Sequence, residues 1–516
     1  MDFRNTPYFH VGRASDLKGR DRVIYRLFEM VPGSLAWLSI IGIIILSKYA
    51  PVWAAYFIIA FDLYWLLKTM YLSIHLRQNF KRMKINMNRD WAELLSRMKS
   101  GHIYHMVILP FYEESFDVVE KSVISVIEAK KADMKTIFVL AREEKVGESA
   151  RKIALKIEEK YKSSFTYFLN TAHPAGVVGE MPGKGSNITY AAKEARKLLD
   201  SEKIQYEDVI VSAFDSDTVV YPDYFLCLAW YFLSQPKPTE VSYQPVPLYN
   251  NNIWNSPAFS RVVASSGTFW QMIQQERPEK LATFSSHAVS FKTLVELDYW
   301  QTNMVSEDSR IFWNAFMAYD GKYKVVPISY PVSMDANLAG SFWGTVRNVY
   351  KQQRRWAWGS ENVAYILMGF LKNKNISLWK KIRVAATQIE GYWSLSTNPI
   401  FIFLLGWLPL ILGSNEFRST VLSYNLPVIT RNLMILCMFG LVLSAVISLK
   451  FLPPPPPNTS KFKKIGMVLQ WILVPFTIMI FGAVPGLDAQ TRLLFGRYMG
   501  FWVTPKYRIM EEKKHA

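Results

Sequence analysis

VIVSAFDSDTVVYPDY, residues 209–224, begins as an apolar run and then reaches Asp215, Ser216 and Asp217. Small and apolar side chains lead up to Phe214, as they do in a strand that is buried on both faces. The acids can end such a strand as a turn, through bonds from their side chains to the backbone. They can equally form a divalent-metal site, because ligands bind at the carboxyl edge of open α/β sheets. The segments around this stretch decide between the two.

Strand-like and helix-like segments alternate between about residues 100 and 345. Apolar runs predict strands at 105–110 (HMVILP), 135–141 (KTIFVLA), 165–170 (FTYFLN) and 208–214 (DVIVSAF). Helix-like stretches at 115–130, 147–161 and 186–200 separate them. Alternation of this kind predicts a parallel α/β sheet. It places Asp215 and Asp217 at the carboxyl end of a central strand.

Two groups of apolar runs flank this α/β region. They lie at residues 31–47, 51–73, 393–413, 432–449 and 465–486. Their lengths match the hydrocarbon core of a bilayer, which needs about 20 residues. Buried core helices are the alternative, but the runs gather on either side of a polar middle. We predict two transmembrane helices within 31–73 and a C-terminal transmembrane cluster at 393–486, with a stiff proline-rich loop at 453–457.

The number of apolar runs does not agree with the composition of the tail about which side of the membrane holds the C-terminus. Two crossings before the α/β region and three after it would put the tail outside the cell. The tail at 487–516 is nevertheless basic and rich in aromatic residues, and we expect it to be cytoplasmic. Pro475 and Pro485 interrupt the last run, which makes that run a candidate for a re-entrant segment.

The formal net charge is +18, with 60 Lys and Arg against 42 Asp and Glu. Nucleic acid is an obvious partner for so basic a chain, but the cations gather beside the apolar runs. Arg77, Lys81, Arg82 and Lys84 follow the second run, and Lys461, Lys463 and Lys464 precede the last. This positive-inside pattern puts residues 1–30 and the α/β region in the cytoplasm, and it suits anionic lipid rather than nucleic acid. Residues 1–30 lack the pattern of a cleaved signal peptide, so the first run is expected to remain as an anchor.

Carboxylates mark two places where a ligand could bind. Asp215 and Asp217 would face the same side of an extended strand, and their hard oxygen atoms suit Mg²⁺ or Mn²⁺. SEDSR (306–310) opens an apolar-periodic segment in which Ser306 suits an N-cap and the acids suit the first turn of a helix. A carboxylate held rigidly at a helix start can also act as a general base, and Asp308 is the candidate.

KQQRRWAWGS, residues 351–360, puts Gln352, Arg355 and Trp356 on one face of a helix. Basic side chains lie beside this face: Arg347, Lys351 and Arg354. We predict an amphipathic interfacial helix at 346–372, which could roof a substrate bound to the sheet.

Loops after the predicted strands carry further candidate ligands. In PGKGSN (182–187), backbone amides and Lys184 suit phosphate, although a flexible loop before an N-cap at Ser186 is the alternative. The spacing is not that of a P-loop, which excludes a nucleoside triphosphatase of that type. LPFYEE (109–114) and VLAREE (139–144) place acids directly after strands, where they could bind a base or a ribose hydroxyl.

Taken in order, these motifs are strand–Pro-x-x-Glu, Lys-Gly-x-Asn, Asp-x-Asp, Glu-Asp and Gln-x-x-Arg-Trp. The series resembles the membrane-bound family-2 glycosyltransferases, the group of the cellulose, chitin and hyaluronan synthases, over about residues 100–360. GFWVTPKYR (500–508) resembles the gating segment of the cellulose synthases. The resemblance implies a Rossmann-like GT-A α/β domain, a nucleotide-diphospho-sugar transferase, at 100–345. This cytoplasmic domain would be inserted between α-helical transmembrane segments of a multi-pass protein of a bacterial-type plasma membrane.

The resemblance also implies roles for single residues in an inverting transfer from a nucleotide sugar. Asp215 and Asp217 would hold Mg²⁺ or Mn²⁺ and the diphosphate, and Asp308, paired with Glu307 in the catalytic motif, would deprotonate the acceptor. The implied substrate contacts are Glu113 and Glu143 or Glu144 for the nucleoside, Lys184 for the nucleotide, Gln352, Arg355 and Trp356 for the diphosphate and acceptor, and Thr504 and Lys506 in the gating segment. The implied partners are a nucleotide-sugar donor, a glycan or lipid acceptor and membrane lipid, and the oligomeric state is open.

Several functions compete at this point. Gln-x-x-Arg-Trp favours a processive polysaccharide synthase, whereas five membrane runs offer little channel wall and favour a single-transfer glycolipid synthase. A transporter should carry ionisable residues in its runs, where only Asp62 and Lys68 occur. An inactive scaffold should have lost Asp217 or Asp308. A phosphatase or nucleotidyltransferase needs more carboxylates nearby, and only Asp223 is close.

The remaining polar and sulfur side chains carry weaker predictions. Sugar specificity is expected around His287, Trp254 and Trp270. His287 is expected to be structural or to line the acceptor site rather than to bind metal, because no second His is near it in the sequence. Cys227 and Cys437 lack neighbours at metal-binding spacing, so we expect both to be reduced and structural.

Overall fold

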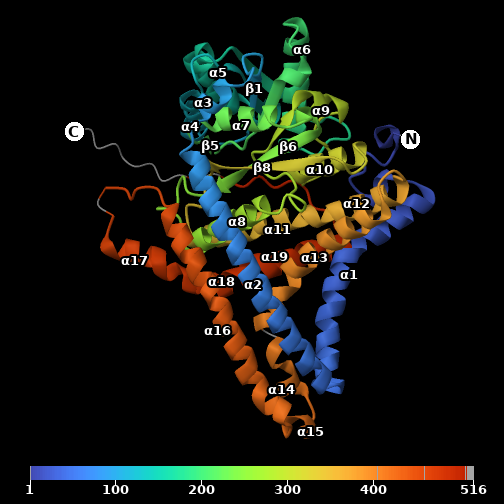
Figure 1. Ribbon diagram of the computed structural model, residues 1–516. Helices are drawn as coiled ribbons and strands as arrows, with labels where there is room; N and C mark the ends of the chain where they lie inside the picture. Colours follow the sequence, from blue (N-terminus) through green and yellow to red (C-terminus); the bar gives the residue numbers. More distant parts are fainter. Residues whose placement is uncertain (1, 404, 458, 506, 508–516) are drawn as a thin grey trace.

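The computed structural model describes residues 2–403, 405–457, 459–505 and 507 of the 516-residue chain. An α/β domain lies at one end of the molecule, and long helices leave it in one direction and converge at the other end (Figure 1). Several helices lie across the boundary between these two parts, so the molecule has three layers.

The first half of the sheet is parallel, as predicted. It consists of β1 (Tyr104–Phe111), β2 (Lys135–Glu143), β3 (Tyr167–His173) and β4 (Val209–Ala213). The described sheet has the order β3-β2-β1-β4-β7-β6-β8-β5. Its second half was not predicted and is mixed: β7 (Ala288–Ser290) runs antiparallel to β4 and β6 (Val241–Leu248), β8 (Lys324–Ser333) runs parallel to β6, and β5 (Val219–Val220) closes the edge.

Both faces of the parallel half are buried, which explains its continuous apolar runs. Met106 and Ile108 of β1 point to one face and pack with α6 (Lys184–Ser201), whereas Val107 and Leu109 point to the other. That second face is covered by α4 (Phe116–Ala129), α5 (Glu148–Tyr161) and α7 (Tyr224–Leu233), with α3 (Trp91–Ser96) at its edge. The three helices predicted from the sequence correspond to α4, α5 and α6.

The middle layer begins with α8 (Ala258–Gln275), which packs against β6. Two short helices, α9 (Phe291–Glu296) and α10 (Glu307–Ala318), follow in the α/β domain. The interfacial helix predicted at 346–372 is instead two helices, α11 (Phe342–Ala357) and α12 (Glu361–Lys372), joined by a 3-10 turn at Trp358–Ser360. Both lie across the boundary between the sheet and the long helices (Figure 1).

The long helices are α1 (Gly19–Tyr49), α2 (Pro51–Met87) and α16 (Val421–Lys450), which run away from the sheet (Figure 1). α13 (Leu378–Phe403), α14 (Leu408–Leu412) and α15 (Asn415–Arg418) precede α16, and α14 and α15 lie at the far end. Within the described residues, four helical stretches are long and apolar enough to cross a membrane: Gly19–Tyr49, Pro51–Met87, Val421–Met438 and Lys461–Leu494. These stretches are compatible with a membrane protein. The run expected at 393–413 is not among them, because it is divided between α13 and α14.

The last apolar stretch is helical throughout, but its helix type changes along the way. It contains α17 (Lys461–Leu469), α18 (Val474–Ile478) and α19 (Val484–Leu494), with a 3-10 turn at Gln470–Leu473 and a π-helical turn at Met479–Ala483 between them. Pro475 and Pro485 start α18 and α19, where a missing backbone N–H costs least. These helices lie across the long helices instead of along them (Figure 1).

Residues 2–18 were expected to be part of a thirty-residue polar segment, but α1 already begins at Gly19. The segment packs on the α/β domain, with Phe3 and Phe9 buried in the same core as α10. The segment before the first long helix is therefore packed against the α/β domain.

Candidate active site at the carboxyl end of the sheet

Asp215, Ser216 and Asp217 lie in a tight turn directly after β4. The Thr218 amide donates to the Asp215 carbonyl at 2.9 Å, so the acids are beyond the strand and the alternation expected for a strand does not apply to them. The Asp217 side chain is fully buried, and its Oδ2 accepts a 2.9 Å bond from the Asp335 amide. The stretch is therefore a turn, as one alternative proposed, and it also contains a buried carboxylate, as the other requires.

Lys184 joins two of the predicted motifs. Its Nζ lies 2.6 Å from Asp215 Oδ1 and 3.0 Å from Asp308 Oδ1, and the Ser285 hydroxyl donates to the other Asp215 oxygen at 2.6 Å. Burial alone would lower the pKa of Lys184, but the carboxylates of Asp215, Asp308 and Glu307 outweigh it and raise that pKa. Positions 184, 215 and 308 thus form one charged cluster, although they are far apart in the sequence.

Two acids begin α10, and their surroundings differ. The Asp308 side chain is partly exposed, whereas Glu307 is 2% exposed. Burial, followed by the nearby Asp308 charge, raises the pKa of Glu307 to about 8, against the opposing charges of Lys184 and Arg355. Glu307 is therefore mostly protonated at neutral pH, which leaves Asp308 as the carboxylate that faces the site.

Ser306 occupies the N-cap position of α10 but does not cap the helix with its side chain. Its hydroxyl and amide donate to Glu361 Oε1 of α12, at 2.7 and 3.1 Å. Trp358 Nε1 donates to the other Glu361 oxygen at 2.9 Å. Glu361, which sequence reasoning did not single out, thus holds the start of the helix that carries Asp308.

His287 is fully buried behind Asp308. Trp300 Nε1 donates to its Nε2 at 3.1 Å, so Nδ1 is assigned the hydrogen and donates to the Phe284 carbonyl at 2.9 Å. Burial lowers the pKa of His287, and its ring is neutral. Both nitrogens are used, which agrees with the expected structural role.

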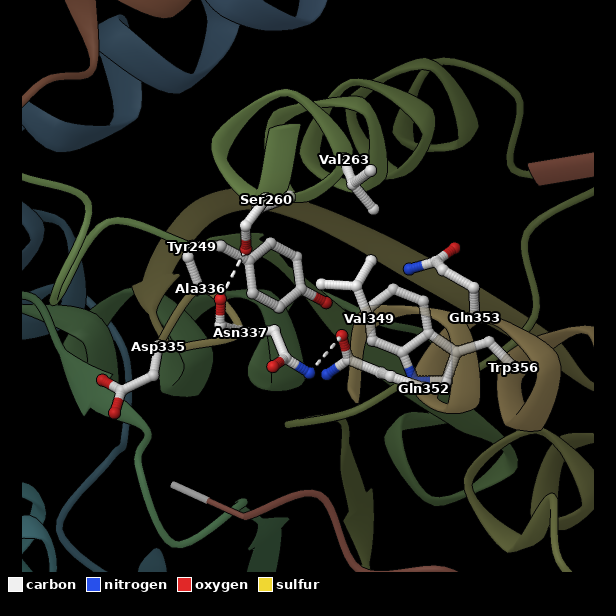
Figure 2. A pocket seen from close by; sticks show the side chains of 11 residues that line it. Tyr249, Ser260, Val263, Asp335, Ala336, Asn337, Val349, Gln352, Gln353 and Trp356 are labelled. Atoms are coloured by element: carbon white, nitrogen blue, oxygen red, sulfur yellow. Dashed lines mark hydrogen bonds between the residues drawn. The ribbon is translucent and has the colours of Figure 1, made fainter. Parts of the chain in front are cut away.

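A small pocket lies between α8 and α11 (Figure 2). The Trp356 ring packs with Tyr249 and Phe284, at centroid distances of 6.0 and 5.8 Å. Gln352 is buried, and its side-chain oxygen accepts a 3.4 Å bond from Asn337, as Figure 2 shows. Three aromatic rings and two amides therefore meet in one place.

Arg355, from the same turn of α11, points elsewhere. Its guanidinium lies 5.0 Å from the Phe501 ring, and its buried Nε has no hydrogen-bond partner among the described residues. Phe501 also contacts Gly183, where an added Cβ would lie 2.7 Å from the Phe501 ring. The predicted gating segment thus lies between the loop before α6 and α11, with Thr504 buried as well. Lys506 lies outside the described residues.

The predicted nucleoside contacts, Glu113 and Glu143 or Glu144, lie where β1 and β2 end. Glu113 is exposed, whereas Glu114 is buried and accepts bonds from the Ser216 hydroxyl at 2.8 Å and the Tyr112 amide at 2.6 Å. Glu143 ends β2 and forms an ion pair with Lys145 at 2.6 Å, and Glu144 is exposed. Nothing in the sequence distinguishes the two neighbouring acids 113 and 114.

Comparisons with known proteins show which family and which solved structures the chain is similar to. The model of a family described as glycosyl transferase family group 2 matches residues 210–482. The mannosyltransferase PcManGT from Pyrobaculum calidifontis, in complex with GDP-Man and Mn²⁺, has 12% identity over 76% of this chain and 99% of that chain, with a TM-score of 0.40. TarS of S. aureus has 13% identity over 68% of this chain and 55% of that chain, with a TM-score of 0.32. No curated protein matches by sequence.

Proposed function

Because the chain belongs to the glycosyl transferase family group 2 and is a glycosyltransferase, we propose that it transfers a sugar from a nucleotide-sugar donor to an acceptor hydroxyl with inversion at the anomeric carbon. Its α/β domain has the GT-A fold expected from the sequence. The observation that carries the proposal is the cluster of Asp215, Lys184 and Asp308, at 2.6 and 3.0 Å. One partly exposed carboxylate next to a phosphate-binding edge suits a single displacement.

The donor diphosphate would bind between cations and a metal. Asp215 and Asp217 supply the hard oxygen ligands that Mg²⁺ and Mn²⁺ use together with substrate phosphates. The Nε of Arg355, for which the described part of the chain offers no hydrogen-bond partner, and the cation of Lys184 are donors of the kind that bind phosphate. The set fits a metal diphosphate, and a bound metal would neutralise negative charge on the leaving group.

The acceptor hydroxyl would lose its proton to Asp308. A positioned general base typically contributes about 10²–10⁴ in rate, because an alcohol is a weak nucleophile at neutral pH. The Lys184 ammonium donates to Asp308 Oδ1 at 3.0 Å, and the protonated Glu307 adds no negative charge next to it. Glu361 and the buried His287 hold the surroundings of this base in place.

The acceptor sugar would bind among the side chains of Figure 2, which enclose only about 10 Å³ in this structure and would have to move apart to admit it. Aromatic rings such as Tyr249 and Trp356 suit the apolar faces of a sugar, and the amides of Asn337 and Gln352 suit its hydroxyls. The pocket walls α8 and α11 lie on the side of the sheet from which the long helices leave (Figure 1). A membrane-borne acceptor, a glycolipid or a lipid-linked glycan, therefore fits this position, in a multi-pass membrane protein with its GT-A domain in the cytoplasm.

Nucleotide release by the detergent-purified protein tests the proposal. A panel of UDP- and GDP-sugars is offered with Mn²⁺ or Mg²⁺ and a membrane lipid extract. Asp217→Asn and Asp308→Asn should abolish release, whereas Asp133→Asn, at an exposed position, should retain it. Release that survives Asp308→Asn, or no release by folded protein with any donor, would overturn the proposal. The chain length of the labelled product separates single from processive transfer.

A further inference from the structure

The stretch from α17 to α19 has two different faces. One face packs on α8: Gln470 accepts a 2.6 Å bond from Arg261, and Trp471 stacks on Phe269 at 5.6 Å. Met467 belongs to the same buried cluster as Tyr249. This face is fixed to the wall of the acceptor pocket.

The opposite face is apolar and exposed. Its side chains recur every three or four residues, so they form one stripe along the helices. From 49% to 86% of each is accessible, and they are Phe462, Ile465, Leu469, Ile472, Phe476 and Ile480. A contiguous apolar stripe of this length marks a surface that another molecule or a membrane covers.

Charge and direction identify what covers the stripe. Lys461, Lys463 and Lys464 are exposed at the start of α17, and none of them forms an ion pair with any residue in the described part of the chain. Cations beside an apolar face suit anionic lipid. The stretch also lies across the direction of α1, α2 and α16, at the level where these helices leave the α/β domain (Figure 1). A protein partner would not explain why the stripe lies in that plane.

The backbone of this stretch fits the surface of a bilayer better than its interior. Two prolines and the 3-10 and π-helical turns interrupt the regular hydrogen-bond pattern. Unsatisfied backbone groups are costly in hydrocarbon, but water satisfies them at the headgroups.

We propose that residues 461–484 lie in the headgroup layer of a membrane that contains anionic phospholipid, instead of crossing it. The stripe faces the acyl chains, and the three lysines face lipid phosphates. This placement corrects the third C-terminal crossing expected from the sequence and leaves the tail on the side of the α/β domain, where Phe501 contacts Gly183.

If the proposed function holds, this placement also fixes how far the acceptor pocket lies from the lipid. Met467 and Tyr249 share a cluster, so the acceptor pocket lies about one helix diameter, about 10–12 Å, above the lipid. A sugar attached to a lipid reaches that height without leaving the membrane.

Depth measurements test the placement without using activity. One cysteine is introduced in place of Ile465, Ile472 or Phe476 in a Cys437→Ser background, in which the remaining Cys227 is fully buried, and it carries a spin label. Oxygen and nickel-chelate accessibilities of the label give its depth in lipid nanodiscs. In-plane helices predict three similar, shallow depths. A crossing helix predicts that positions 465 and 476, eleven residues apart, differ by about 16 Å. Labels at Leu38 and Ile45 of α1 are the matched control and should differ by about 10 Å.

A second comparison tests the choice of anionic lipid. The label at position 472 should lie deeper in nanodiscs with phosphatidylglycerol than in neutral ones. Replacing Lys461, Lys463 and Lys464 with Gln should remove this difference, whereas replacing the exposed Lys152, Lys162 and Lys193 should not. A depth gradient along 465–476, labels that stay in water, or a depth independent of lipid charge would each overturn the proposal. The transferase assay is unaffected by these outcomes, so the two proposals fail separately.

Discussion

Arg310, two residues after Asp308, is predicted to be among the most sensitive positions for stability. Its side chain is fully buried, with 0% exposed. The guanidinium donates to Asn362 at 2.7 Å, to the Val11 carbonyl at 2.8 Å and to Gln301 at 3.2 Å, and it lies 4.1 Å from the Tyr365 ring. These bonds join α10 to α12 and to residues 2–18.

Arg310→Met keeps an apolar stem and removes all three bonds. Each buried acceptor left without a donor costs about 1–3 kcal/mol, and some of the amides will find other partners. The sum is about 3–5 kcal/mol, the range seen when one member of a buried charged network is removed. For a domain of this size, 1 kcal/mol shifts Tm by about 2–4 °C, so we expect a fall of about 6–20 °C.

Thermal unfolding of the detergent-purified protein, followed by tryptophan fluorescence, measures this shift. Arg151→Met is the matched control, because Arg151 makes an exposed ion pair with Glu148 on α5. Exposed pairs contribute about 0–1 kcal/mol, so the control should fall by less than about 4 °C. If Arg310→Met melts within that same margin, the network does not hold α10 in the way described.

Four further predictions concern the charged residues of the site. Asp308→Asn should lower kcat by about 10²–10⁴. Glu307→Gln should retain activity at pH 7. The melting temperature of this variant minus that of the wild type should increase from pH 5 to pH 8, because the folded state raises the pKa of wild-type Glu307 to about 8 and so loses stability over that range. An equal difference at both pH values would refute this. Glu114→Ala should raise the donor KM by about tenfold, which corresponds to about 1–2 kcal/mol, because the buried Glu114 holds the Ser216 hydroxyl between the two aspartates. Glu113→Ala should not change the donor KM. Equal KM values for the two variants would show that Glu114 does not support donor binding in this way. Chelation should abolish nucleotide release and Mn²⁺ should restore it if Asp217 binds metal; undiminished turnover in excess EDTA would exclude that role.

The parallel half of the sheet could be predicted because its strands are buried on both faces and alternate with helices. The other half could not be predicted in the same way. β6 and β8 each contain two prolines, which normally argue against a central strand, and the register shifts between Gln244 and Val246 where they pair. β7 has only three residues, too few for a pattern.

The site could be predicted at the level of motifs but not of every atom. Lys184, Asp215 and Asp308 were singled out separately, and only the fold brings them within bonding distance. Glu114 was not singled out, because the sequence does not show which of the two neighbouring glutamates turns inward after β1 to accept the Ser216 bond. Length and hydropathy made the run at 465–486 a candidate crossing, but they do not reveal that α8 packs on one of its faces.

The bond between Val11 and Arg310 has a consequence for biogenesis. The two residues are 299 positions apart in the chain, and the first two long helices lie between them. Residues 2–18 can bond locally to α1, through Tyr8 to Asp21 and Ala14 to Glu29, but their contacts with α10 and α12 form only after the ribosome has released those helices. Long-range contacts of this kind form slowly, because a large loop must close before they stabilise anything. A fragment that starts after residue 18 leaves the buried Arg310 guanidinium without one of its acceptors.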